Sequence, residues 1–341
     1  MSAEISQLLG QVSGGGSLTF DEMSAAIDSI MRGGWTDEQI ALLLVSLAAK
    51  GETVDEVAGA AAAMRQHMTP IRSRHTEILD TCGTGGGGSA MFNVSTTAAI
   101  VAAAAGVPVA KHGNCSITSR SGSADVLVEL GVNIRASVAQ VEACLDELGL
   151  CFCFAPLMHP SMKHVAAVRK KLGIRTIFNV LGPLANPAGA CYQLLGAGRP
   201  ELRSLLAGAM TKLGTQRTFV VSGEDGLGDV TLAGTTHVTE VSDGKTREFT
   251  WQPDDFGIAP QPHAGLAVEN PAASATVIRK ILAGQPGPAR DIVVLNAAAG
   301  LIVAGKEIDP KAAAKRAAEA IDSEASQSLL ARLAEKSHAM A

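Results

Sequence analysis

A run of glycines between an apolar segment and a hydroxyl-rich segment constrains the fold of this chain more than any other feature. Residues 80–89 read DTCGTGGGGS, follow the apolar pair Ile78-Leu79, and lead into residues 92–97 (FNVSTT) and an alanine-rich stretch. Glycine lets the backbone turn sharply and approach a ligand closely. Consecutive N–H groups and the start of the following helix supply fixed positive charge for an anion. The order of strand, glycine loop and helix therefore predicts a phosphate-binding site at a strand end.

A second loop with the same chemistry follows the next predicted strand. Residues 111–122 (KHGNCSITSRSG) bring cations, hydroxyls and glycines directly after the apolar stretch 107–110. Neighbouring parallel strands end at the same edge of a sheet, where α/β proteins bind ligands. Lys111 or Arg120 alone would be interpreted as a solvated surface charge. Two adjacent loops of the same kind favour a shared anion site.

Two familiar nucleotide motifs fit these loops less well. Gly83-x-Gly85-x-x-Gly88 formally matches the dinucleotide fingerprint, but residues 89–93 separate it from the next helical pattern. The following strand also leads into Lys111, where a dinucleotide fold would place an acidic residue for the ribose. Neither loop contains Gly-Lys-Ser/Thr, which argues against an ordinary nucleotide-hydrolysing loop.

Composition limits the classes of protein that fit. The chain has 341 residues, enough for one large domain or two, with 47% apolar but only 3% aromatic residues. This favours close packing of helices on a sheet. Lys and Arg number 28 against 33 Asp and Glu, a net charge of -5, which argues against a general nucleic-acid binder. A polyanionic partner would need a local basic pocket.

The cysteines and the apolar segments predict a soluble cytoplasmic protein with no membrane contact. None of the six cysteines forms a CxxC pair, so we expect reduced, mostly buried thiols, with Cys151 and Cys153 on one face of a strand. The N-terminus lacks a signal-peptide pattern. The longest apolar run, residues 98–110, contains Gly106 and Pro108 and is too short to span a bilayer.

The pattern of elements predicts a small helical domain followed by a larger α/β domain. Residues 1–66 have helical periodicity, with Asp21, Thr36 and Thr53 as expected caps and Glu56 at a capping-box position, and residues 70–75 resemble a linker. From residue 78 strands and helices alternate, which indicates a mostly parallel central sheet flanked by helices. The expected strands are 78–82, 107–110, 151–155, 193–196 and 218–222, with short strands in 231–249. The expected helices are 95–105, 122–130, 138–148, 201–213, 272–282, 291–304 and 309–334.

Several segments in one order resemble the anthranilate phosphoribosyltransferases, a tryptophan-pathway family. The resemblance covers nearly the whole chain. The matching segments are 83–86 (GTGG), 92–96 (FNVST), 111–114 (KHGN), 121–127 (SGSADVL), 159–163 (HPSMK), 168–170 (VRK), 175–187 (RTIFNVLGPLANP) and 224–227 (EDGL).

The resemblance implies transfer of a phosphoribosyl group from phosphoribosyl pyrophosphate to anthranilate, with release of pyrophosphate. It implies a helical domain, residues 1–70, joined by helices near 160–185 and hinged to an α/β domain, residues 71–341, usually in a homodimer. It leaves open an association with the enzyme that makes anthranilate. The implied substrate-binding residues are Gly83, Gly86, Gly87, Asn93, Ser95, Thr96, Lys111, His112, Gly113, Asn114, Thr118, Ser119 and Arg169. Arg169 would face the anthranilate carboxylate, and Ser95 and Asp229 would hold Mg²⁺.

The chain departs from the family pattern at four places that handle phosphate or metal. It has Gly87 where the family has aspartate, Met91 where it has a hydroxyl residue, Cys115 where it has arginine, and Gly228-Asp229 where it has Asp-Glu. The loss of carboxylates at positions 87 and 228 should weaken metal binding. An alternative is therefore a divergent paralogue with another acceptor, such as a pyrimidine, or a non-catalytic nucleic-acid-binding role. The presence of Lys111, Asn114 and Arg169 favours the working transferase.

Overall fold

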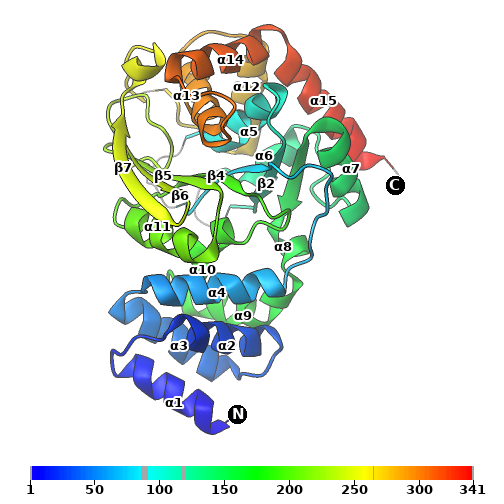
Figure 1. The fold of residues 1–341 in the computed structure, drawn as a ribbon. Helices are drawn as coiled ribbons and strands as arrows, with labels where there is room; N and C mark the ends of the chain where they lie inside the picture. Colours follow the sequence, from blue (N-terminus) through cyan, green and yellow to red (C-terminus); the bar gives the residue numbers. More distant parts are fainter. Residues whose placement is uncertain (1, 86–90, 117–119, 264, 340–341) are drawn as a thin grey trace.

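The chain folds into a small helical part and a larger α/β part, as the sequence predicts. The computed structural model describes residues 2–85, 91–116, 120–263 and 265–339. Figure 1 shows the helical part with the N-terminus at the bottom, and the sheet with its covering helices above. The helical part begins with α1 (Ser2–Ser13), α2 (Phe20–Met31), α3 (Asp37–Lys50) and α4 (Val54–Gln66).

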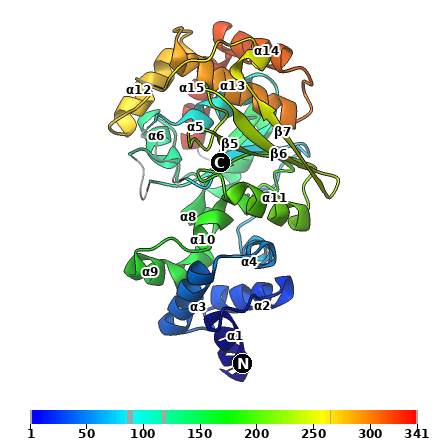
Figure 2. The same ribbon diagram turned by 90° about the vertical axis from the view of Figure 1, so that its left-hand side faces the viewer.

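A later segment of the chain adds to the helical part. α9 (Lys163–Leu172) packs against α2 and α3, and the short α10 (Phe178–Leu181) packs against α4. Figures 1 and 2 both show α9 beside these helices, although it is far from them in sequence. Val165, Val168 and Phe178 join the same apolar core as the buried side chains of α2, α3 and α4.

Threonine caps begin three of the N-terminal helices. The predicted caps Thr36 and Thr53 are confirmed, and each forms a capping box with the residue three positions later. The prediction of Asp21 as a cap is wrong. Thr19 caps α2 instead, because its hydroxyl accepts a hydrogen bond from the Glu22 N–H at 3.2 Å and the Glu22 carboxylate accepts one from the Thr19 N–H at 2.8 Å. Asp21 lies in the first turn, where its charge suits the helix dipole.

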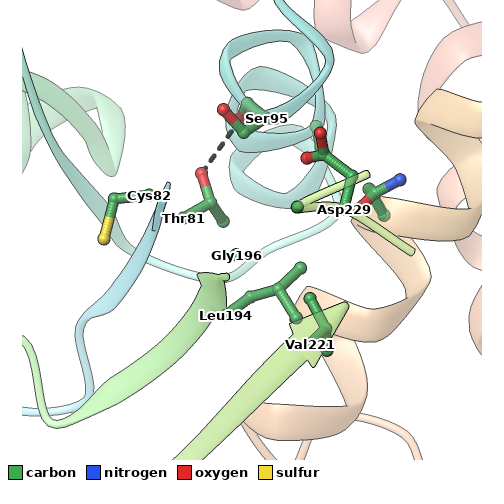
Figure 3. Close-up of a pocket in the computed structure, with 10 residues that line it drawn as sticks. Thr81, Cys82, Ser95, Leu194, Gly196, Val221 and Asp229 are labelled. Atoms are coloured by element: carbon green, nitrogen blue, oxygen red, sulfur yellow. Dashed lines mark hydrogen bonds between the residues drawn. The ribbon is translucent and has the colours of Figure 1, made fainter. Parts of the chain in front are cut away.

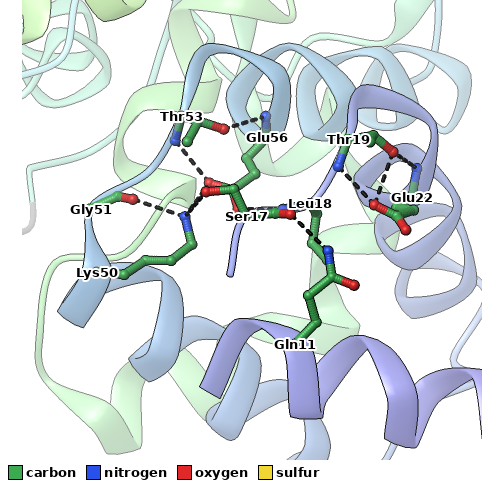
Figure 4. Close-up of polar contacts among 9 residues, drawn as sticks. All are labelled: Gln11, Ser17, Leu18, Thr19, Glu22, Lys50, Gly51, Thr53 and Glu56. Atoms are coloured by element: carbon green, nitrogen blue, oxygen red, sulfur yellow. Dashed lines mark hydrogen bonds and ion pairs between the residues drawn. The ribbon is translucent and has the colours of Figure 1, made fainter. Parts of the chain in front are cut away.

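The ends of these helices meet at the buried carboxylate of Glu56, which is 0% exposed. Its oxygens accept hydrogen bonds from the N–H groups of Leu18 at 2.9 Å and Thr53 at 2.8 Å, and from the ammonium of Lys50 at 2.7 Å (Figure 4). A buried charge is tolerated when it is paired and hydrogen-bonded in this way. We call these four residues the Glu56 cluster. It joins the segment before α2, the end of α3 and the start of α4.

One seven-stranded sheet forms the centre of the α/β part, in the order β3-β2-β1-β4-β5-β6-β7. The strands are β1 (Leu79–Gly83), β2 (Val109–Gly113), β3 (Leu150–Phe154), β4 (Tyr192–Gly196), β5 (Arg217–Gly223), β6 (Thr236–Ser242) and β7 (Lys245–Trp251). The first five pair in parallel, whereas β5–β6 and β6–β7 are antiparallel. The chain runs outward from β1 to β3 and then returns to β4 on the other side of β1. This reversal creates a switch point at the carboxyl ends of β1 and β4, where α/β sheets bind ligands.

Helices cover both faces of the sheet, and each face has its own apolar core. α5 (Val94–Ala104) and α13 (Pro288–Val303) cover one face, and α11 (Leu202–Leu213) covers the other, between the sheet and α4 (Figure 1). The core on the α5 side lies within the α/β part, whereas the core on the α11 side continues into the helical part. The other helices are α6 (Ser123–Glu129), α7 (Val138–Leu148), α8 (Ala155–Met158), α12 (Pro271–Leu282), α14 (Pro310–Asp322) and α15 (Ala325–His338).

Two of the predicted boundaries are wrong. The single helix expected over residues 309–334 is α14 and α15, because Glu324 takes a left-handed backbone conformation with a φ of 62°. Lys111 to Gly113, expected in a loop, are the last residues of β2 and pair with β3. The expected linker at 70–75 contains neither helix nor strand. None of the helices in the described part of the chain is long and apolar enough to cross a membrane.

The cysteines are free thiols, as expected, but only half of them are fully buried. Cys144, Cys151 and Cys153 are buried, whereas Cys115 is exposed. The sulfurs of Cys151 and Cys153 lie 3.9 Å apart, so both point to one face of β3 as the alternation predicts. Burial raises the pKa of the Cys144 thiol to about 11, which favours the unreactive protonated form.

Candidate active site

A small pocket lies at the switch point, between the carboxyl ends of β1, β4 and β5 and the start of α5 (Figure 3). It has an empty volume of about 230 Å³, part of which is open to solvent. Its lining includes Thr81, Ser95, Gly196, Asp229 and Asn296. The lining residues therefore come from three strands, two helices and the loop after β5, which fixes the shape of the pocket through the fold.

The ammonium of Lys111 lies buried beside this pocket. Lys111 is 3% exposed, and its Nζ donates to the carbonyl of Thr81 and, at 3.3 Å, to the hydroxyl of Ser95. Burial lowers the pKa of Lys111, while the negative charges of Asp80 and Asp229 act to raise it. A buried cation at the carboxyl ends of parallel strands can attract and hold a phosphate group more strongly than a solvated one.

Asp229 brings a carboxylate to the same place from the loop after β5. Burial raises the pKa of Asp229 to about 6, and the positive charge of Lys111 acts in the opposite direction. Figure 3 shows the carboxylate pointing toward the first turn of α5, where Ser95 lies. The fold thus brings together an ammonium, a hydroxyl and a carboxylate from three separate segments of sequence, all three of them predicted site residues.

The other acidic residues of this loop are engaged elsewhere. Asp225 accepts a hydrogen bond from the hydroxyl of Thr231 and pairs with the ring of His263. Burial acts to raise the pKa of Asp225, but these hydrogen bonds hold that pKa below its usual value. Glu224 is exposed and lies 3.3 Å from the ring of His237. The carboxylate that lines the pocket is therefore the third acid of the loop.

Close backbone packing explains why two glycines meet beside Asp229. A Cβ atom on Gly196 would lie 1.7 Å from the carbonyl oxygen of Gly228, so no side chain fits at position 196 with this backbone. A Cβ atom on Gly228 would lie 3.0 Å from the backbone nitrogen of Gly198. The aspartate that the resembling family has at position 228 would need a shifted loop here.

Two of the predicted residues at the start of α5 have their side chains directed into the protein. The Asn93 carboxamide accepts hydrogen bonds from the hydroxyls of Ser121 at 2.6 Å and Ser274 at 2.8 Å, which ties α5 to the second loop and to α12. Thr96 is 1% exposed, and its hydroxyl has no hydrogen-bond partner within the described ranges. From these positions, backbone N–H groups at the helix start are better placed than these side chains to meet an anion.

The predicted glycines that are described mark close approaches at strand ends. A Cβ atom on Gly83 would lie 3.0 Å from the Gly196 carbonyl oxygen, and one on Gly113 would lie 2.1 Å from the hydroxyl of Ser123. Asn114 is exposed after β2, and its side chain accepts a hydrogen bond from the next N–H at 2.8 Å. Four further predicted residues lie outside the described residues: Gly86, Gly87, Thr118 and Ser119.

His112 forms a buried pair with His159. The Nδ1 of His112 lies 3.0 Å from the Gly182 carbonyl oxygen, which can only accept, so this nitrogen carries the proton. The Nε2 atoms of the two rings lie 3.2 Å apart, and His159 must therefore donate to His112. Burial lowers the pKa of His112 to about 4 and the pKa of His159 to about 3. The charge of His112 also acts to lower the pKa of His159. Both rings are neutral at physiological pH.

Arg169 lies apart from the pocket, in the last turn of α9. Its guanidinium lies over the ring of Phe178 at 5.5 Å from the ring centroid, and burial lowers the pKa of Arg169. Among the described residues it has no carboxylate partner within ion-pair distance. Phe178 begins α10, which leads directly to the Gly182 carbonyl that binds His112. Arg169 and the β2 residues are thus linked through α10 rather than in contact.

Three buried polar residues at the site were not predicted from the sequence: Asp80, His159 and Asn296. Asp80 is 0% exposed and accepts a hydrogen bond from the His112 N–H at 3.1 Å. Asn296 is 1% exposed on α13. For Asn296 the available signal was a polar residue inside an apolar run, which predicts a buried group with a specific partner, whereas Asp80 and His159 follow apolar residues at the end of such a run.

The fold and the site define a glycosyl transferase. A family model described as "Glycosyl transferase family, helical bundle domain" matches residues 6–68, and one described as "Glycosyl transferase family, a/b domain" matches residues 75–327. The first matches the N-terminal helices, and the second matches the α/β part that contains Lys111, Ser95 and Asp229. The reaction class is that of a pentosyltransferase.

Relatives of this chain specify the family within that class. It is 47% identical over 334 residues to an anthranilate phosphoribosyltransferase of Rhodopirellula baltica, covering 98% of both chains. A crystal structure of this enzyme from Thermus thermophilus has a TM-score of 0.91 and 40% identity, over 97% of this chain and 99% of that one. The Saccharomyces cerevisiae enzyme in complex with phosphoribosyl pyrophosphate and Mg has a TM-score of 0.90 and 27% identity, over 100% of this chain and 99% of that one. The chain belongs to the anthranilate phosphoribosyltransferase family. These matches support the working transferase and do not support the divergent paralogue.

Proposed function

We propose that this chain transfers the 5-phosphoribosyl group of phosphoribosyl pyrophosphate to the nitrogen of anthranilate in a magnesium-dependent reaction that releases pyrophosphate. The observation that carries this proposal is the buried ammonium of Lys111 at the switch point, which donates a hydrogen bond to the Ser95 hydroxyl and interacts electrostatically with the Asp229 carboxylate. A site of this kind suits a polyanionic sugar phosphate. Relatives at 47% identity carry the name of this activity.

The phosphate groups would be held at the ends of β1 and β2 and at the start of α5. Lys111 supplies the charge, and the backbone N–H groups at the start of α5 supply fixed donors. The residues that we assign to phosphoribosyl pyrophosphate are Gly83, Gly86, Gly87, Asn93, Ser95, Thr96, Lys111, Gly113, Thr118 and Ser119. At Gly83 and Gly113 the absence of a Cβ atom lets neighbouring protein groups pack closely against the strand ends.

Ser95 and Asp229 are the residues that we assign to Mg²⁺. The described residues contain no group of three or more His, Cys, Asp or Glu side chains arranged to hold a metal ion. Mg²⁺ commonly binds through one or two carboxylates together with the phosphates of a substrate, so one carboxylate and one hydroxyl fit an ion carried by pyrophosphate. When bound, the ion would neutralise charge on the leaving group. The yeast relative has been solved with both phosphoribosyl pyrophosphate and Mg.

Arg169, His112 and Asn114 are assigned to the acceptor. The Arg169 guanidinium has no carboxylate partner in the described chain and can therefore pair with the carboxylate of anthranilate. His112 is a neutral contact rather than a base, because its Nε2 already accepts from His159. An aniline-type nitrogen is unprotonated at neutral pH, so the reaction does not need a strong general base.

The chemistry explains why binding residues are enough for catalysis. Cleavage at the anomeric carbon builds negative charge on pyrophosphate, which Lys111 and aimed N–H groups stabilise. The positive charge on the sugar is stabilised by its own ring oxygen. Holding the amine close to the anomeric carbon supplies much of the remaining rate.

The proposal extends to organisation and cellular context. A helical domain, residues 1–70 with the helices near 160–185, would hold the acceptor side, and an α/β domain, residues 71–341, would hold phosphoribosyl pyrophosphate.

We further propose a cytoplasmic homodimer that can associate with anthranilate synthase. Leu42 and Val45 on α3 are 46% and 41% exposed, an apolar pair on one helix face that suits contact with a second copy.

One assay tests the proposed function directly. The protein is mixed with phosphoribosyl pyrophosphate and anthranilate across a series of Mg²⁺ concentrations, and the loss of anthranilate fluorescence is followed. We expect turnover that depends on Mg²⁺. No turnover at any Mg²⁺ concentration would refute the proposal, and turnover of another acceptor in place of anthranilate would favour the divergent paralogue.

A further inference from the structure

Asn296 is a polar side chain buried in the middle of the apolar helix α13. It is 1% exposed, and its helix neighbours Leu295 and Ala297 are buried as well. Asparagine is a poorer helix former than alanine, and a buried amide is costly unless its hydrogen bonds are made. Helix formation and apolar packing therefore give no reason for asparagine at this position, which points to a partner outside the helix.

The partner of Asn296 is the backbone of Val230. The Oδ1 of Asn296 accepts a hydrogen bond from the Val230 N–H at 2.9 Å, and its Nδ2 donates to the Val230 carbonyl at 2.9 Å and to the Ile292 carbonyl at 2.8 Å. Val230 lies outside the strands, so it has no ladder partner. One side chain thus satisfies both backbone groups of a buried loop residue, as a neighbouring strand would.

Val230 is the residue next to Asp229, and the residue on the other side is also fixed. Gly228 packs so closely on β4 that its carbonyl oxygen lies 1.7 Å from the position that a Cβ atom on Gly196 would take. Asp229 is therefore held between two immobilised backbone positions. Its side chain points toward the first turn of α5, where Ser95 lies (Figure 3), and the positive charge of Lys111 acts on it.

We propose that Asn296 is a positioning residue, which holds the backbone of Val230 and thereby keeps the Asp229 carboxylate in place beside Lys111 and Ser95 for Mg²⁺-bound pyrophosphate. This inference rests on the proposed function, because it gives Asp229 the metal. Groups that orient metal ligands through hydrogen bonds typically change metal affinity by about 10–100-fold when they are removed. Among the described residues that line this pocket, Asp229 is the only one with a carboxylate, so no second carboxylate of that lining can replace it.

The test compares Asn296→Ala with a matched control, Asn133→Ala. Asn133 also ties a loop to a helix, since its Nδ2 donates to the Ser337 carbonyl at 3.1 Å, but it lies outside the pocket lining. Calorimetry gives the apparent affinity for phosphoribosyl pyrophosphate at several Mg²⁺ concentrations, without anthranilate. We expect Asn296→Ala to weaken the Mg²⁺-dependent affinity by about 10–100-fold and Asn133→Ala to leave it unchanged.

A double-mutant cycle shows whether Asn296 acts through Asp229. In an Asp229→Asn background, Asn296→Ala should cause little further loss, because the carboxylate that it positions is already gone. A full additional loss in that background would overturn the proposal. So would Asn296→Ala binding as tightly as the wild type.

Thermal unfolding separates these results from a general loss of structure. Should Asn296→Ala not fold, Asn296→Asp carries the same test, because it keeps the size and the acceptor for the Val230 N–H but cannot donate to the carbonyls while ionised. The same loss is expected for it, and wild-type affinity would contradict the proposal. If the wild-type chain itself neither binds nor turns over substrate, the proposed function fails instead.

Discussion

Two regions of the molecule place a lysine near a buried carboxylate, and they differ in how completely the carboxylate oxygens are hydrogen-bonded. In the Glu56 cluster, both carboxylate oxygens have donors from the backbone or from Lys50. Beside the pocket, Asp80 is 0% exposed, and its Oδ2 has no hydrogen-bond partner among the described residues. Burial raises the pKa of Asp80 and Asp229 and lowers the pKa of Lys111.

The difference shows how similar groups serve structure in one place and function in another. A satisfied buried network fixes the fold, because breaking it exposes several unpaired groups at once. An incompletely satisfied one keeps hydrogen-bonding capacity and charge for a ligand, at some cost in stability. We therefore expect substitutions in the Glu56 cluster to change stability and substitutions beside the pocket to change activity.

The largest effect is expected for Glu56→Ala. It leaves Lys50 and the N–H groups of Leu18 and Thr53 without their acceptor, so the free energy of unfolding should fall by about 3–5 kcal/mol. Urea unfolding measures this change. A loss of only about 1 kcal/mol, the value of an exposed ion pair, would show that the cluster does not hold the helices together.

Lys111→Met should lower activity rather than stability. It removes the cation that stabilises the departing pyrophosphate, so kcat/KM should fall about 100–1000-fold, as for loss of one donor to developing charge. Lys50→Met is the matched control, because it removes the partly buried lysine of the Glu56 cluster and should lower the unfolding free energy rather than kcat/KM. Wild-type kcat/KM in Lys111→Met would remove this residue from the site.

Arg169→Ala tests the acceptor side of the comparison. A charged hydrogen bond to the anthranilate carboxylate contributes about 1.5–3 kcal/mol, so KM for anthranilate should rise about 10–150-fold. The exposed neighbour Lys170 provides the control, and Lys170→Ala should leave KM unchanged. Equal effects of the two substitutions would indicate general attraction of an anion rather than a specific contact.

The smallest effect is a pH dependence of stability from the histidine pair. Burial lowers the pKa of His159 to about 3, below the value of about 6.5 for an unfolded histidine. As the pH falls below 6.5, the unfolded chain gains a proton that the folded chain does not, so stability is lost. His159→Gln should flatten this fall between pH 6.5 and 4.5 by about 1.4 kcal/mol per pH unit. Identical slopes in urea unfolding of wild type and variant would contradict the neutral pair.

Local patterns predicted most of the fold. Periodicity and caps located α3, α4 and the five parallel strands, and α5 begins at Val94, beyond the glycine run as expected. The errors arose where two local signals compete. Thr19 and Asp21 are both good caps, and only the Glu22 contact decides between them. Asp322 and Ser323 suit a turn, but the helical pattern continues on both sides of them, so the break at Glu324 was not predicted.

Site residues were predictable where a local sequence pattern marks them, and they were not predictable where their role depends on contacts between residues far apart in sequence. The polar segments after the apolar stretches identified Lys111 and Ser95, which lie near the end of β2 and in the first turn of α5. Asn296 could not be assigned, because its partner Val230 is distant in sequence and the hydrogen bonds exist only in the folded chain. The pairing of His112 with His159 likewise requires β2 and the segment after α8 to be placed side by side.

The central claim is that Lys111, Ser95 and Asp229 form a pocket for magnesium-bound phosphoribosyl pyrophosphate, and calorimetry of that ligand tests it most directly. The wild type should bind phosphoribosyl pyrophosphate with an affinity that increases with Mg²⁺, and Lys111→Met should bind it far more weakly at the same unfolding temperature. A folded wild-type protein that gives no heat of binding, or a Lys111→Met variant that binds as the wild type does, would contradict the account.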